Sequence, residues 1–135
     1  MPNRFGPVVR LACFGAALVV VMVILYESMQ ERGRPGVPDL STNEAYLGHF
    51  AIYAVMAFCA LGALGPRTFQ GFLAVMLFAA GLGISLELYQ AQLPTRTASA
   101  GDVLADIAGA IFGAAGYVML TFLVEPLKRS LPTKL

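Results

Sequence analysis

Four ionisable side chains lie within or beside apolar segments that are long enough to cross a membrane. They all fall between Glu87 and Gly113, and they are Glu87, Arg96, Asp102 and Asp106. A charge at the centre of a bilayer costs about 2.5–3.5 kcal/mol on insertion scales, so such residues usually face a packed interior or a water-filled cavity. This stretch therefore gives the strongest indication of function in the chain.

The last apolar segment carries two of these acids at helical spacing. Asp102, Asp106, Gly109 and Gly113 follow one another at steps of four, three and four, so in a helix they share one face. Glycines four residues apart allow a second helix to approach closely. We therefore predict that Gly109 and Gly113 pack against a neighbouring helix and that both acids point into the bundle.

Two other segments present polar residues that could meet these acids. Glu87 and Gln90 are three residues apart, and His49 and Tyr53 are four apart, so each pair shares a helix face. Arg96 lies in the short connection that follows Glu87. We expect all these groups to converge in the outer half of the bilayer.

Such a cluster could bind a ligand or catalyse a reaction. The predicted ligand-binding set is His49, Tyr53, Glu87, Gln90, Arg96, Ser99, Asp102 and Asp106. Arg96 could hold a phosphate or carboxylate group through two parallel hydrogen bonds. Glu87, His49 and Asp106 could instead act as general acids and bases. The sequence contains no evident nucleophile, so the catalytic residues stay unknown and the choice between binding and catalysis stays open.

Simpler interpretations exist for each residue. Asp102 fits a capping box with Ser99, Arg96 fits a solvated loop arginine, and the buried groups could only hold helices together. One histidine among carboxylates could also bind a divalent cation. Because the chain has no His-x-x-x-His or Cys-x-x-Cys spacing, we predict no metal site and no cofactor.

Composition predicts the elements that position these residues. Of the 135 residues, 58% are hydrophobic and 13% are charged, whereas soluble domains carry about 25% charge. Four apolar blocks of membrane-spanning length predict an all-α, multi-pass bundle in one domain, residues 1–135, with spans at about 8–27, 42–64, 69–92 and 102–124. Pro94 should stop the third helix, and Pro126 should follow the fourth. A net charge of +1 indicates no nucleic-acid partner.

Loop charges predict the orientation. With four spans both termini lie on one side, together with six of the nine Lys and Arg residues: Arg4, Arg10, Arg67, Lys128, Arg129 and Lys134. The positive-inside rule then favours cytoplasmic termini. Loops 27–44 and 93–101 would face the outside of the cell.

Several motifs resemble those of VanZ-like bacterial membrane proteins. They are Glu87-x-x-Gln90, Leu93-Pro94-x-Arg96, Ser99, Asp102, Gly109-Ala110 and Gly113, together with His49-Phe50-x-x-Tyr53 on the second span. The resemblance covers about residues 44–116. Two positions depart from the family pattern. Ala45-Tyr46 stands where Asp-Lys is frequent, and Asp106 stands where asparagine is frequent.

The resemblance implies a bacterial inner-membrane protein with a role in the cell envelope. The family name comes from a protein linked to low-level resistance to the glycopeptide teicoplanin. Expected partners are the lipid bilayer and a lipid or lipid-linked cell-wall precursor. A structural or accessory bundle for another envelope protein is a further interpretation. Transport would require oligomers, and a homo-oligomer stays open.

Overall fold

The computed structural model describes residues 6–30, 42–65 and 69–130, so most of the predicted first loop lies outside the described residues. These residues form α1 (Pro7–Met29), α2 (Thr42–Leu64), α3 (Phe69–Gln90) and α4 (Ala100–Ser130). All four helices are long and apolar enough to cross a membrane, which in α4 applies to Ala100–Val124. The fold is therefore the predicted all-α bundle of membrane-spanning helices.

The helix boundaries follow the sequence signals, with one correction. α1 begins at a proline, which suits the first turn because the amide N–H is unneeded there. α3 ends at Gln90, ahead of Pro94. The prediction that α4 ends before Pro126 is wrong, because the helix continues to Ser130. A proline removes one backbone hydrogen bond, and the helix tolerates that loss near its C-terminal end.

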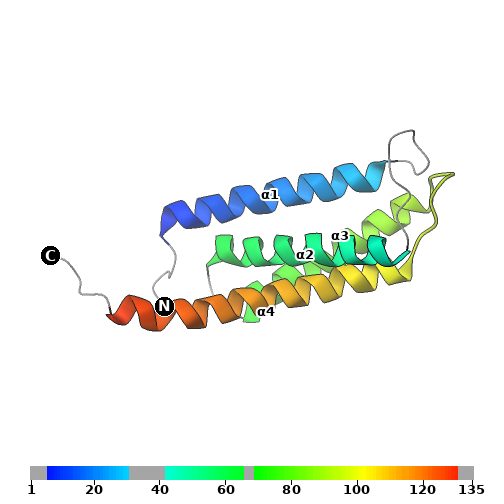
Figure 1. The fold of residues 1–135 in the computed structure, drawn as a ribbon. Coiled ribbons are helices and arrows are strands. Elements are labelled where there is room, and N and C mark those ends of the chain that lie inside the picture. The colour runs from blue at the N-terminus through cyan, green and yellow to red at the C-terminus, as the bar shows by residue number, and fades with distance from the viewer. Residues whose placement is uncertain (1–5, 31–41, 66–68, 131–135) are drawn as a thin grey trace.

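Helix α2 lies at the centre of the bundle (Figure 1). It packs against α1, α3 and α4, and its most extensive contact is with α4. The two predicted packing glycines explain this contact. A Cβ atom at Gly109 would overlap the carbonyl oxygen of Phe50, and one at Gly113 would overlap that of Ala54. Both glycines therefore lie against the backbone of α2.

Helix α1 lies on the outside of this arrangement. It contacts α2 extensively and α3 only slightly. Ile24 and Ser28 are its only buried residues. Large apolar side chains such as Leu11, Met22 and Val19 are exposed along it. An apolar surface of this extent suits contact with lipid chains.

Arg10 ties α1 to the end of α2. Its Nε donates a hydrogen bond to the Ala63 carbonyl at 2.9 Å, and its Nη2 donates one to the Leu64 carbonyl at 3.3 Å. The last carbonyls of a helix have no partner within the helix. A cation there satisfies these acceptors and is attracted by the negative end of the helix dipole.

Candidate functional site

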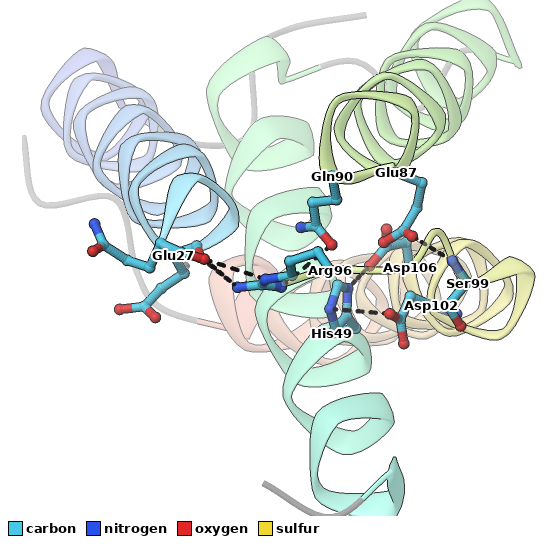
Figure 2. A network of polar contacts seen from close by, with 9 residues as sticks. Glu27, His49, Glu87, Gln90, Arg96, Ser99, Asp102 and Asp106 are labelled. Atoms are coloured by element: carbon cyan, nitrogen blue, oxygen red, sulfur yellow. Dashed lines mark hydrogen bonds and ion pairs between the residues drawn. The ribbon is translucent and has the colours of Figure 1, made fainter. Parts of the chain in front are cut away.

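Four ionisable side chains meet at the end of the bundle where α2 and α4 begin and α3 ends. We call His49, Glu87, Asp102 and Asp106 the polar cluster (Figure 2). His49 lies about 10 Å along α2 from its first residue, at 1.5 Å per residue. The three carboxylates are almost fully buried, with exposed fractions of 5%, 6% and 1% for Glu87, Asp102 and Asp106. The convergence expected from helical spacing is present for these four residues.

Asp106 makes the closest side-chain contact in the polar cluster. Its Oδ1 lies 2.9 Å from Nδ1 of His49. The carboxylate also lies against Gly83 of α3, where a Cβ atom would collide with it. The Tyr53 hydroxyl is buried near Asp106 but forms no hydrogen bond within the described part of the chain. Asp106 therefore fills the space between α2 and α3 and fixes one nitrogen of the imidazole.

Glu87 is fixed by the backbone that leads into α4. Its Oε2 accepts a hydrogen bond from the Ser99 N–H at 2.6 Å. The Ser99 hydroxyl in turn accepts one from the Asp102 N–H at 3.2 Å, which is the bond expected of an N-cap serine. Half of the predicted capping box is thus present. Glu87 takes the place that the Asp102 carboxylate would have in the other half.

Because Glu87 accepts the Ser99 N–H in place of Asp102, the Asp102 side chain points into the polar cluster. Its Oδ2 lies 4.0 Å from Nε2 of His49. Because the cap uses the backbone N–H of Asp102, its carboxylate is available for other contacts. The interpretation of Asp102 as only a capping acid therefore does not describe its side chain.

Arg96 contacts α1. Its Nε and Nη2 donate hydrogen bonds to the Gln30 carbonyl at 3.2 and 2.9 Å, and Nη2 also donates to the Glu27 carbonyl at 3.2 Å. Its Nη1 donates to Oε1 of Gln90 at 3.3 Å. Figure 2 shows the guanidinium reaching from the loop toward α1. Arg96 and Gln90 thus anchor the α3–α4 connection to the C-terminal end of α1.

Several positions that shape the site were not predicted. Gly83 makes room for Asp106, and Gly101 makes room for the ring of Tyr46, since a Cβ at either glycine would collide with that side chain. Gly83 lies one helical turn before Glu87 and so on the same face of α3, and this spacing could have placed it in the site. The contact between Tyr46 and Gly101 joins distant segments and left no local signal. The carbonyls of Glu27 and Gln30 were not predictable either, because every residue has a carbonyl.

The arrangement offers hydrogen-bond acceptors to a common point. Glu87, Asp102 and His49 each present one potential ligand atom, and these three atoms lie within 4.8 Å of one another. The His49 side chain keeps 25% of its surface exposed, so the cluster is reachable from outside the helix bundle. Such a site can hold hydroxyl or amine donors, a proton or a cation.

Four helices of membrane-spanning length, three of which carry the polar cluster, define a small multi-pass membrane protein with a polar site at one end. The family described as VanZ/LLP1 matches residues 13–122, and the chain belongs to this family. The match contains all four residues of the polar cluster and both packing glycines. No curated protein and no solved structure matches the chain.

Proposed function

We propose that this protein binds the polar head of a lipid or lipid-linked cell-wall precursor at the outer side of the bacterial inner membrane. The observation that carries the proposal is the convergence of His49, Glu87 and Asp102 from three different helices. Charged groups at membrane depth are costly and are usually retained for a function. A ligand head with complementary groups would offset that cost.

The chemistry of the polar cluster favours a head group that donates hydrogen bonds. Glu87 and Asp102 offer carboxylate oxygens as acceptors, and Nε2 of a neutral His49 would be a third, whereas the Arg96 guanidinium is engaged by the carbonyls of α1. Hydroxyl and amine groups, as found on sugars and amino-acid head groups, fit such a set. The acyl chains of the ligand would remain in the bilayer, against the exposed apolar surfaces of the helices.

Family membership supports an envelope role for this binding. The proposal includes tolerance of glycopeptides such as teicoplanin, in which a protein that holds a surface amphiphile would alter how the antibiotic meets its target. The predicted orientation, with the polar cluster near the outer surface, agrees with that role. Loop charges are the support for this orientation.

A membrane-embedded enzyme is a second candidate. The observation in its favour is the hydrogen bond between Asp106 and His49, because a carboxylate that orients an imidazole is a common acid–base arrangement. Glu87 and Asp102 would then contact the reacting head group. A binding protein would release the bound lipid unchanged, whereas an enzyme would release an altered lipid.

Native mass spectrometry of the detergent-purified protein tests the proposal. We expect the wild type to retain a lipid adduct of defined mass from envelope extracts and Glu87→Gln to lose it. Glu27→Gln is the matched control, because Glu27 is exposed and only its backbone carbonyl is used by Arg96. Circular dichroism and thermal unfolding check that each variant is folded.

The outcomes separate the candidates. A specific adduct that depends on Glu87 supports binding, and a lipid product of changed mass supports the enzyme. If the folded wild type retains no lipid in preference to bulk phospholipid, the proposed binding function is wrong.

A further inference from the structure

The three converging side chains have the donor composition of a metal site. His49 supplies an imidazole nitrogen, and Glu87 and Asp102 each supply a carboxylate oxygen, with these ligand atoms within 4.8 Å of one another. Imidazole nitrogen combined with carboxylate oxygen suits Zn²⁺ and related first-row ions. Both carboxylates are buried, which sets them apart from the exposed acidic groups common on protein surfaces.

Asp106 prepares the imidazole for such a role. The Asp106 carboxylate lies 2.9 Å from Nδ1, and an ionised carboxylate can only accept a hydrogen bond. When Nδ1 donates its hydrogen to it, the lone pair of a neutral imidazole lies on Nε2. Histidines that bind metals usually donate their other ring N–H to a carboxylate or carbonyl in this way. Asp106 thus occupies the place of the carboxylate that usually accepts this second N–H in metal-binding histidines.

The Asp102 side chain provides a second, independent observation. It keeps only 9% of its surface exposed, and within the described ranges the side chain that its carboxylate pairs with is His49. Its Oδ2 faces Nε2 of His49 at 4.0 Å. With a neutral imidazole, two acceptors would point at each other in a poorly solvated place, which is unfavourable unless a positive charge lies between or beside them.

We propose that His49, Glu87 and Asp102 bind a divalent cation of the Zn²⁺ or Mn²⁺ class, with Asp106 orienting His49. The remaining coordination positions would be taken by water or by polar groups of a ligand. In tetrahedral coordination, bonds of about 2.0–2.2 Å place two ligand atoms of one ion about 3.3–3.6 Å apart. The three ligand atoms, which lie within 4.8 Å of one another, would therefore move closer by up to about 1.5 Å on coordinating the ion.

This cation site differs from the expectation that the sequence carried. The absence of paired-histidine or paired-cysteine spacing argued against a metal, but here the ligands come from three helices and leave no such local pattern. The proposal does not depend on lipid binding, because it rests on the protein's own side chains. Its competitor is a proton, which would turn His49 into an imidazolium between two carboxylates.

Isothermal titration calorimetry tests whether a divalent cation binds at this site. Detergent-purified protein is stripped with EDTA and then titrated with ZnCl₂ or MnCl₂. We expect one saturable site per chain that is weakened at least tenfold in Asp102→Asn and in Glu87→Gln. Asp102→Asn keeps the backbone N–H that bonds to Ser99, so the start of α4 should stay folded. Glu27→Gln should bind like the wild type.

Spectra of the Co²⁺-loaded protein give a second readout. Absorption bands of a low-coordinate Co²⁺ ion with nitrogen and oxygen ligands are expected in the wild type and absent in Asp102→Asn. If the wild type shows no saturable binding, or if folded Asp102→Asn and Glu87→Gln bind as tightly as it does, the cation site does not exist. Native mass spectra of the EDTA-stripped protein then show separately whether a lipid adduct persists, so failure of the cation site leaves the lipid proposal testable.

Discussion

At the scale of single residues, the Asp106–His49 pair decides whether the polar cluster can exist within a membrane. Asp106 is 1% exposed, and its Oδ1 lies 2.9 Å from Nδ1 of His49. A buried acceptor left without its partner costs about 1–3 kcal/mol. The pair therefore stabilises the bundle as well as orienting the imidazole.

We predict that His49→Ala lowers the free energy of unfolding by about 1–3 kcal/mol, because it leaves the Asp106 carboxylate buried without its partner. Asp106→Asn should cost less than about 0.6 kcal/mol, the average worth of one hydrogen bond between membrane helices, since an amide oxygen can still accept the imidazole N–H. Unfolding in mixed detergent and SDS measures both variants. Equal losses for the two would contradict the assignment of this pair.

Residue-level prediction from the sequence worked where helical spacing alone decided the outcome. Asp102 and Asp106 lie on one stripe of α4, and Glu87 and His49 face them, as spacing predicts. Arg96 was different, because its partners are backbone carbonyls of α1. Any residue can present a carbonyl, so no side-chain pattern in the sequence identifies which ones an arginine will reach.

At the scale of whole elements, the contact between α2 and α4 sets the position of the polar cluster. Gly109 and Gly113 bring the α4 backbone against that of α2 at Phe50 and Ala54. The same stripe carries Asp106 one turn earlier, so close approach of the two helices also brings Asp106 within reach of α2. Small residues and acids thus work together along one face of α4.

Even one added methyl group should disturb this contact. We predict that Gly113→Ala destabilises the bundle by about 1–3 kcal/mol, because its Cβ would overlap the Ala54 carbonyl oxygen. Gly116→Ala is the matched control on the same helix, since its Cβ would meet only the Phe58 ring at 3.8 Å. The same unfolding assay should find Gly116→Ala as stable as the wild type or slightly more stable. A control that is as damaged as Gly113→Ala would refute the proposed contact.

Element boundaries were predictable to within a few residues, because a membrane fixes the length of an apolar helix. The exception is the end of α4, which passes Pro126. The apolar span ends at Val124, but a helix can extend beyond the bilayer wherever its backbone bonds remain available. Hydropathy therefore predicts where a span ends more reliably than where a helix ends.

At the scale of the whole molecule, an arginine lies at each end of the bundle and bonds to carbonyls at the C-terminal end of a helix. Arg10 contacts the end of α2, and Arg96 contacts the end of α1. Both contacts involve α1, the helix with the fewest buried residues. They hold the outer helix at its two ends, in addition to its packing against α2.

The orientation of this bundle in the membrane decides which compartment the polar cluster faces. The charge bias predicts that the α3–α4 connection lies outside the cell and the α2–α3 connection inside. In a background with Cys13 and Cys59 replaced by alanine, we expect Thr97→Cys to react with an impermeant maleimide on intact cells. Gln70→Cys, at the start of α3, should react only after the membrane is permeabilised. Both positions are exposed, so access to the reagent depends on the side of the membrane and not on burial. The opposite labelling pattern would place the polar cluster on the cytoplasmic side and would rule out a ligand in the outer leaflet.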